Sequence, residues 1–159
     1  MPKPIVIVDL DGTLADVRHR LHFVQGPGKK RWKRFFQAQE NDIPVASVRA
    51  RIHELSREHE IVIVTARPDI CREGTERWLE KHEIPYSRMY MRSSGDHRPD
   101  YVVKREILGR IGKERVVQVF EDRPLVCRMY RDEGLEVVEI ESDQASQAVN
   151  NDYERTGAG

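Results

Sequence analysis

IVIVDLDGTL, residues 5–14, is the stretch that decides the fold of this chain. Its four aliphatic residues predict a strand buried on both faces, and the strand stops at two carboxylates and a glycine. In an open parallel α/β sheet, ligands bind beyond the carboxyl ends of the strands, so we expect Asp9 and Asp11 to line such a site. Two neighbouring acids repel each other unless a cation compensates. We interpret the pair as a site for Mg²⁺, which prefers carboxylate and carbonyl oxygens.

Length and composition exclude several classes of protein. The 159 residues are enough for one domain with a real core. Lys and Arg number 27, as do Asp and Glu, so no overall field marks the chain as a nucleic-acid binder. No apolar run reaches the length of a membrane span and the N-terminus has no secretory pattern, so we predict a cytoplasmic protein with no membrane contact. Cys71 and Cys127 lack metal-ligand spacing and are predicted to be free thiols.

After the first strand, predicted helices and strands alternate. The predicted strands are Ile61–Val64, Arg88–Met91, Val116–Phe120 and Leu135–Ile140, and the predicted helices cover 45–55, 69–81, 103–111 and 124–134. The alternation predicts right-handed crossovers and a doubly wound parallel sheet of the Rossmann-like α/β class. With the strand order three-two-one-four-five, Asp9 lies beside Asp122, which follows the fourth predicted strand.

Residues 15–44 form a predicted small cap inserted after the first strand. Residues 15–28 lack periodicity and indicate a loop, whereas 29–39 carry Trp32, Phe35 and Phe36 at the spacing of an amphipathic helix. The basic run 29–34 either is a solvated helix face or contacts the backbone of a nucleic-acid end, and the sequence leaves both open. We predict a domain over 1–141 and a polar C-terminal tail over 142–159.

Asp9-x-Asp11-Gly12-Thr13, directly after an aliphatic strand, resembles motif one of the haloacid dehalogenase-like superfamily of aspartate-nucleophile phosphotransferases. The alternative is a plain acidic turn, since Asp-Gly after a hydrophobic strand is also a hairpin signal. The resemblance implies that Asp9 attacks phosphorus to form an aspartyl-phosphate. It implies that Asp11 protonates the leaving alkoxide and then activates water. Asp9, Asp11 and Asp122 would hold Mg²⁺.

The resemblance gives roles to residues at the ends of later strands. Thr65-Ala66-Arg67 resembles motif two, which binds phosphate oxygens, and arginine can hold two of them at once. A strand threonine and a surface arginine are the alternatives. Lys104 resembles motif three, a fixed cation near the transferred group. Asp100 precedes it by four residues and lies on the same helix face, a pair that is also common as an exposed salt bridge.

A narrower resemblance runs from Ile5 to about Ile140. The sequence resembles the 3′-phosphatase domain of polynucleotide kinase/phosphatase enzymes at Asp96-x-Arg98-x-Asp100-x-x-Val103-Lys104-x-Glu106-Ile107, at Glu121-Asp122-Arg123, and, in the small cap, at Trp32-x-x-Phe35 and Asp42-x-Pro44. It implies that either Arg18 or Arg20, together with Arg67 and Asp100, serves catalysis. It also implies that Asp122 binds the metal and that Glu121 contacts the metal ligands without binding the metal itself.

Two departures from the family pattern are visible: Thr-Ala-Arg stands where Ser-Gly-Arg is frequent, and Glu-Asp where Asp-Asp is frequent. No phosphate-cradling Gly-x-x-x-x-Gly-Lys-Ser/Thr occurs, so we expect no kinase activity from these residues. The predicted function is a Mg²⁺-dependent phosphatase that removes 3′-terminal phosphates from DNA or RNA ends, in a repair setting with a kinase or ligase partner. A nucleotidase or small-metabolite phosphatase, and a non-catalytic subunit that binds phosphate or nucleic-acid ends, are the open alternatives.

Overall fold

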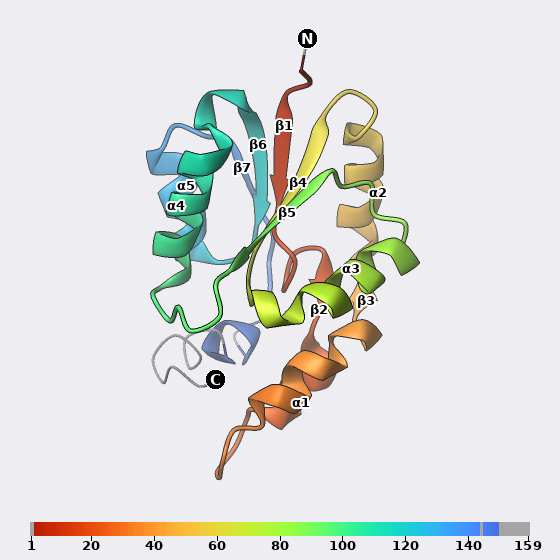
Figure 1. Ribbon diagram of the computed structural model, residues 1–159, viewed down its shortest axis with the longest axis vertical. Helices are drawn as coiled ribbons and strands as arrows, with labels where there is room; N and C mark the ends of the chain where they lie inside the picture. The colour runs from red at the N-terminus through yellow and green to blue at the C-terminus, as the bar shows by residue number, and fades with distance from the viewer. Residues whose placement is uncertain (1, 144, 150–159) are drawn as a thin grey trace.

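A computed structural model describes residues 2–143 and 145–149. Within this part of the chain, a central sheet contains five parallel strands in the order β5-β4-β1-β6-β7 (Figure 1). The strands are β1 (Ile5–Val8), β4 (Glu60–Pro68), β5 (Arg88–Arg92), β6 (Val116–Glu121) and β7 (Val137–Glu139). Counted along the chain, this is the order three-two-one-four-five under which Asp9 was expected beside Asp122, and the doubly wound α/β fold is confirmed.

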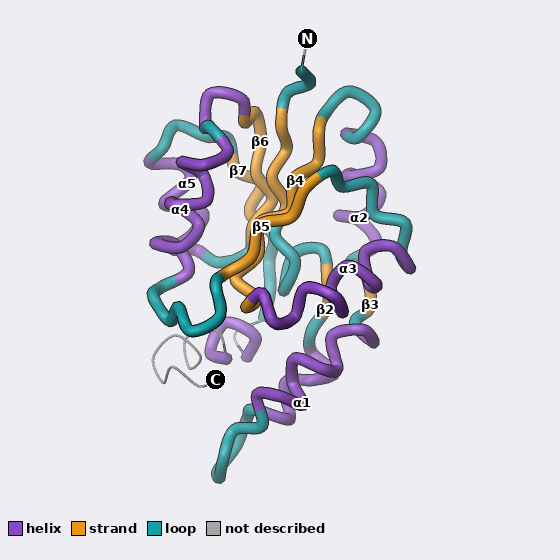
Figure 2. Tube along the Cα trace, viewed as in Figure 1, coloured by secondary structure: helices purple, strands orange, loops and turns teal. Residues whose placement is uncertain are grey.

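Helices cover both faces of this sheet (Figure 2). They are α2 (Ala46–Leu55), α3 (Arg72–Lys81), α4 (Asp100–Ile111) and α5 (Pro124–Asp132). Val6 and Val8 belong to the core on the α2 and α3 side, whereas Ile5 and Ile7 belong to the core on the α4 and α5 side. Because consecutive strand residues point to opposite faces, both faces of β1 are buried, which is why its sequence is continuously aliphatic.

The segment between β1 and α2 forms a layer beyond the carboxyl ends of the strands, with α1 extending away from the sheet (Figure 1). It contains β2 (Ala15–Asp16), a 3₁₀ helix (Arg18–Phe23), α1 (Trp32–Gln37), a second 3₁₀ helix (Ala38–Asn41) and β3 (Ile43–Pro44). β2 and β3 pair antiparallel. The helix predicted from residue 29 begins at Trp32, because the chain leaves a turn in which Gly26 and Gly28 both have positive φ.

Smaller differences from the predicted elements have local causes. The helix predicted over 69–81 starts as a 3₁₀ turn, η3 (Asp69–Cys71), and α3 begins at Arg72, which is a frequent arrangement at the N-terminus of an α-helix. Residues 145–149 are helical, and the side chain of Val149 is buried in the core, so part of the predicted tail is packed. Residues 150–159 of that tail lie outside the described residues. Both cysteines are free and buried. Over the ranges described, no helix combines the length and apolar character that crossing a membrane requires.

Candidate active site

Asp9 follows β1 at the carboxyl edge of the sheet, and a lysine and a threonine contact its carboxylate. Lys104 Nζ donates to Asp9 Oδ1 at 2.9 Å and to Glu121 Oε2 at 2.8 Å. Burial lowers the pKa of Lys104, but the charges of Asp9 and Glu121 outweigh it and raise that pKa well above its ordinary value. A charged, buried ammonium group from α4 therefore stands beside the predicted nucleophile.

Three carboxylates meet next to Lys104. Oxygens of Asp9, Glu121 and Asp122 lie within 4.8 Å of one another. Burial and the charge of Asp9 raise the pKa of Glu121 to about 7, against the opposing charge of Lys104. Burial and the charges of Asp9 and Glu121 raise the pKa of Asp122 to about 10. One lysine is too little positive charge to favour ionisation of all three buried acids, and an all-oxygen donor set of this kind fits a hard divalent cation such as Mg²⁺.

The lack of a side chain at Gly12 allows Asp122 to approach the turn after β1. The φ of Gly12 is +80°, and a Cβ atom at this position would lie 2.2 Å from Asp122 Oδ2. The next residue, Thr13, places its Oγ1 3.2 Å from both Asp9 Oδ2 and Asp122 Oδ1. The turn after β1 therefore brings an acid from the start of the chain against one from its last third, and only glycine fits the turn without strain.

The segment after β7 also contacts Asp122, which the sequence analysis did not anticipate. Ser142 Oγ donates to Asp122 Oδ2 at 2.7 Å, and Gln147 Nε2 lies 3.3 Å from the same oxygen. Ser142 Oγ in turn accepts a hydrogen bond from Gln147 Nε2 at 2.6 Å. Nothing in the local sequence marked these residues, because they lie in the stretch read as a polar tail.

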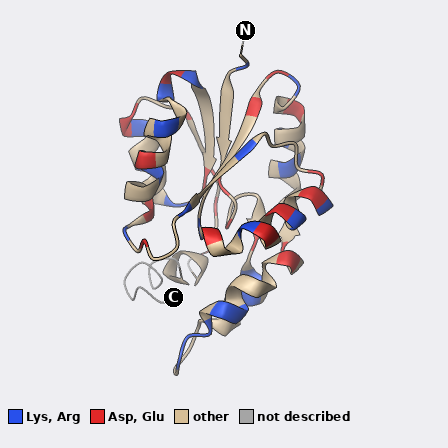
Figure 3. Cartoon of the chain, in the orientation of Figure 1, with Lys and Arg blue, Asp and Glu red and all other residues tan. Residues whose placement is uncertain are grey.

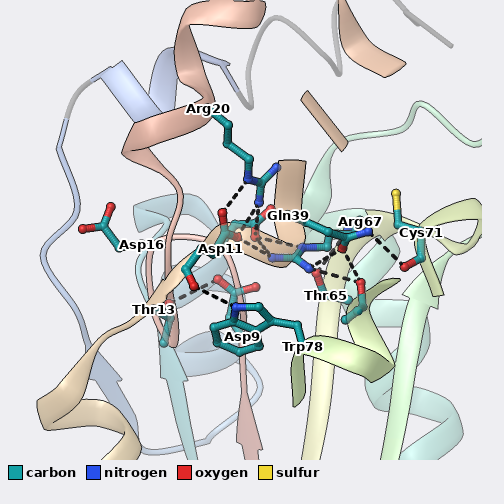
Figure 4. Close-up of polar contacts among 12 residues, drawn as sticks. Asp9, Asp11, Thr13, Asp16, Arg20, Gln39, Thr65, Arg67, Cys71 and Trp78 are labelled. Atoms are coloured by element: carbon teal, nitrogen blue, oxygen red, sulfur yellow. Dashed lines mark hydrogen bonds and ion pairs between the residues drawn. The ribbon is translucent and has the colours of Figure 1, made fainter. Parts of the chain in front are cut away.

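Two arginines hold Asp11 on the cap side of the site (Figure 4). Its Oδ1 accepts from Arg67 Nη2 at 2.6 Å and from Arg20 Nη2 at 3.2 Å. Burial raises the pKa of Asp11, but Arg67 and Arg20 outweigh burial and hold that pKa below its ordinary value. This differs from the predicted metal set: within the described residues, the acid cluster contains Glu121 and not the Asp11 carboxylate.

The sequence left Arg18 and Arg20 as alternatives, and Arg20 is the one that lies at the site. Its side chain is buried, and its guanidinium carbon lies 4.4 Å from the centre of the Phe35 ring. Arg18 is paired with Asp16 on the surface, with 69% of its side chain exposed. Figure 4 shows Asp16 pointing away from the other labelled residues. Arg18 therefore does not approach Asp11 in this structure.

A buried network connects both arginines to the cap. Asp42 Oδ1 accepts from Arg20 Nε at 2.8 Å, and Asp42 Oδ2 lies 3.2 Å from Arg67 Nη2. Gln39 Oε1 accepts from Arg67 Nη1 at 2.6 Å and from Thr75 Oγ1 at the same distance. The motif Asp42-x-Pro44 could have signalled the first of these residues, whereas Gln39 and Thr75 carry no recognisable signal.

Asp100 begins α4 and joins two more arginines. One oxygen accepts from Arg92, and the other pairs with Arg123 Nη1 at 2.5 Å. Arg92 also donates to the carbonyl oxygen of Ala66 at 3.0 Å. Asp100 is therefore a buried anchor for two guanidinium groups as well as a neighbour of Lys104, and neither arginine was assigned a role from the sequence.

These groups surround one pocket. Its lining combines residues at the carboxyl edge of the sheet and in α4, most of them charged or polar, with aromatic residues of the cap: Asp9, Asp11, Thr65, Ala66, Arg67, Pro68, Asp100, Lys104, Arg123, Trp32, Phe35 and Phe36. The buried hydroxyl of Thr65 accepts from the backbone N–H of Arg67 at 3.1 Å, within the irregular last residues of β4. Cations on one side and a carboxylate that could act as nucleophile on the other suit the transfer of a phosphoryl group.

Comparison with known proteins agrees with this geometry. Residues 3–144 match the family described as the polynucleotide kinase PNKP phosphatase domain. The chain belongs to this family. The PNKP-type phosphatase domain is therefore the family to which the sequence resemblance pointed, and the chain is a phosphatase with a haloacid dehalogenase-like fold.

Individual relatives carry this domain within longer chains. The phosphatase domain is 32% identical over 132 residues to the "Putative bifunctional polynucleotide kinase/RNA ligase" of Autographa californica nuclear polyhedrosis virus, covering 80% of this chain and 18% of the viral protein. A chain in the Pnkp1/Rnl/Hen1 complex has a TM-score of 0.74 and 27% identity, covering 89% of this domain and 47% of that chain. This chain thus spans less than half the length of these relatives.

A more distant structure supports the fold only. A haloacid dehalogenase-like hydrolase from Streptococcus pneumoniae has a TM-score of 0.62 at 13% identity, covering 92% of this chain and 90% of its own. The similarity therefore extends over almost the whole of both chains.

Proposed function

We propose that this phosphatase domain is a Mg²⁺-dependent phosphomonoesterase that removes 3′-terminal phosphates from DNA or RNA ends. The observation that carries the proposal is the cluster at the sheet edge, in which Lys104 bridges Asp9 and Glu121 while Asp122 closes the group. Asp9, Glu121 and Asp122 would hold the cation, in place of the set that included the Asp11 side chain. Bound Mg²⁺ would reduce the repulsion between Asp9 and a phosphate dianion.

In the proposed reaction, a carboxylate oxygen of Asp9 attacks phosphorus and the bond to the leaving oxygen breaks. Asp11 gives its proton to that oxygen, which departs as an alcohol. Asp11 then accepts a proton from water, which attacks the aspartyl-phosphate and releases inorganic phosphate. In the free protein Arg67 is paired with Asp11. A bound phosphoryl group would share this arginine, and its negative charge would raise the proton affinity of Asp11.

The surrounding residues supply positioning. Thr65 and Arg67 would bind phosphate oxygens, with Arg20 behind them, while Asp100 fixes Arg123 at the edge of the pocket. Residues 15–44 would act as the cap of the domain predicted over 1–141, and Ser142, Gln147 and Val149 of the predicted tail add contacts to that domain. The names of the relatives include a polynucleotide kinase/RNA ligase and an RNA repair complex. We therefore infer nucleic-acid repair as the setting, with kinase and ligase activities as partners.

Phosphate release from matched substrates tests the proposal. A 3′-phosphorylated DNA oligonucleotide, its RNA equivalent, a 3′-mononucleotide, a 5′-mononucleotide and p-nitrophenyl phosphate are compared with Mg²⁺ and with EDTA. We expect Mg²⁺-dependent release, fastest from the 3′-phosphorylated oligonucleotides. Equal or faster release from 5′-mononucleotides would instead indicate a nucleotidase.

Asp9→Asn tests the nucleophile. The amide keeps the size of the side chain and removes the attacking charge, so kcat should fall by about 1,000-fold or more on every substrate. The circular dichroism spectrum should stay that of the wild type. Substantial residual turnover would refute the assignment of Asp9.

A further inference from the structure

A second hollow lies beside the catalytic pocket and continues it. It runs between α1 and the structures around the start of α3, including η3 and the loop after β5. Trp32, Phe36 and Pro68 line both the catalytic pocket and this hollow, which we name the side groove. A molecule whose phosphate reaches Asp9 can therefore extend into the side groove.

The direction of the reaction favours this path. In-line displacement places the leaving group opposite the nucleophile. Asp9 lies at the strand ends, and α1, with its aromatic residues, lies beyond those ends (Figure 1). The leaving group of the proposed reaction then points toward the α1 side of the pocket. There, Trp32 and Phe36 line both the catalytic pocket and the side groove.

The side groove has an apolar wall that is held in place. Ile70 of η3 is 80% exposed, the highest value among the large exposed hydrophobic side chains of the described residues. Its turn is fixed to the loop after β5, because Asp69 Oδ1 accepts from Ser94 Oγ at 2.5 Å and from Ser94 N at 3.1 Å. Single exposed isoleucines are common on protein surfaces, but Ile70 lines a groove that continues the catalytic pocket. It therefore offers apolar surface to a molecule that occupies both.

The remaining lining is polar and suits the rest of a nucleotide chain. Arg77 Nε donates to Glu40 Oε1 at 2.7 Å across the groove, and both side chains are about half exposed. Lys33 of α1 also lines the groove and belongs to the basic run 29–34. Figure 3 shows basic residues along α1 and the loop before it. Because Glu40 and Glu73 also line the groove, the positive charge beside its apolar surface comes from Lys33 and the basic run 29–34. That side of the groove matches phosphodiester groups next to a nucleobase.

We propose that the side groove binds the terminal nucleoside of a polynucleotide, with Ile70 against the base and Lys33 near the next phosphodiester. The proposal rests on the proposed function and adds a specificity determinant to it. Ile70 thus distinguishes a polynucleotide end from a small phosphomonoester that fills the catalytic pocket alone. The contact is apolar and therefore tolerant of base identity.

Ile70→Asp tests the side groove through a ratio of two activities. The kcat/KM for a 3′-phosphorylated oligonucleotide, divided by that for p-nitrophenyl phosphate, should fall about tenfold, chiefly through KM. Ile70→Leu should restore the ratio. Val117→Asp is the matched control. Val117 is also an exposed aliphatic residue, but it lies near the amino end of β6, whereas the acid cluster lies at the carboxyl end of that strand. An unchanged ratio in Ile70→Asp would overturn the proposal and point to a protein partner as the occupant.

A binding measurement separates failure of the groove from failure of the proposed function. Fluorescence anisotropy of a labelled 3′-phosphorylated oligonucleotide is measured in the Asp9→Asn background, where turnover plays no part. Ile70→Asp should raise Kd about tenfold, and Lys33→Glu should also weaken binding and reduce its salt dependence. Equal Kd values with and without the Ile70 substitution would refute binding of the terminal nucleoside in the side groove. If the wild type releases phosphate from no substrate, the proposed function fails, and the binding result still decides the groove.

Discussion

At the scale of single residues, Gly12 tests the site most directly. Gly12→Ala forces a Cβ atom into the position of Asp122 Oδ2 and places a side chain at positive φ. We expect a loss of about 1–3 kcal/mol in unfolding free energy from the strain, and displacement of Asp122 should remove most of the activity. Denaturant unfolding and phosphate release measure the two effects. Gly109→Ala is the control, since no atom lies within 4 Å of a Cβ there.

The acid cluster predicts how stability depends on pH. Glu121 has its pKa raised from 4.5 to about 7 and Asp122 from 3.8 to about 10, so the folded protein binds more protons than the unfolded chain. The unfolding free energy of the metal-free protein should therefore fall as pH rises from about 5 to 8, by up to about 1.4 kcal/mol per pH unit for each acid that is protonated in the folded protein and ionised in the unfolded chain. Lys104 stays charged throughout this range.

A bound cation should change this dependence. Mg²⁺ favours the ionised acids, so the fall with pH should shrink when the metal is present. Urea unfolding in EDTA and in Mg²⁺, at several pH values, measures both slopes. Identical slopes in the two conditions would contradict a metal site at these acids.

At the scale of elements, the cap and the sheet edge are joined by Asp42, the residue just before β3. Asp42 holds Arg20 and Arg67 with its carboxylate, while its backbone carbonyl accepts from Trp78 Nε1 of α3 at 2.9 Å. The cap thus orients the arginines that face Asp11, and α3 fixes the position of the cap. The link explains how a small insertion can position Arg20 and Arg67 although Asp42 itself is not part of the acid cluster of Asp9, Glu121 and Asp122.

Asp42→Asn should therefore uncouple the cap from the site. Two buried guanidinium groups would lose a charged acceptor, which should cost about 2–3 kcal/mol in stability and about tenfold in kcat/KM. Phosphate release and thermal unfolding are the measurements. Asp16→Asn is the matched control, since its partner Arg18 is on the surface, and it should change neither value appreciably. Wild-type kinetics in Asp42→Asn would show that the arginines do not depend on this carboxylate.

At the scale of the whole molecule, residues near the end of the described chain complete a site built by its beginning. Ser142 and Gln147 orient Asp122, which stands against the turn after β1. Replacing Gln147 by Leu should raise the Mg²⁺ concentration for half-maximal activity about tenfold. Gln118→Leu, near the opposite end of β6, serves as the control. An unchanged Mg²⁺ requirement would assign Gln147 a packing role only.

The sequence by itself determined the doubly wound parallel sheet and the family, and the structure showed the strand order. Continuous aliphatic strands ending in acids leave few topologies, because parallel strands need crossovers of one hand and place their carboxyl ends together. The roles proposed for Asp9 and Lys104 came from the motifs of the family resemblance, and in the structure Lys104 Nζ lies 2.9 Å from Asp9 Oδ1.

Only the tertiary structure decided which way each side chain turns. Asp11 turns to Arg20 and Arg67, while Glu121 joins the acid cluster, although the sequence assigned the metal to Asp11 and a supporting place to Glu121. Ser142 and Gln147 reach the site from a segment without a recognisable motif, and Asp42 reaches it from a motif that carried no assigned role. The physical reason is that burial and pairing depend on contacts between residues far apart in the chain, which local spacing does not encode.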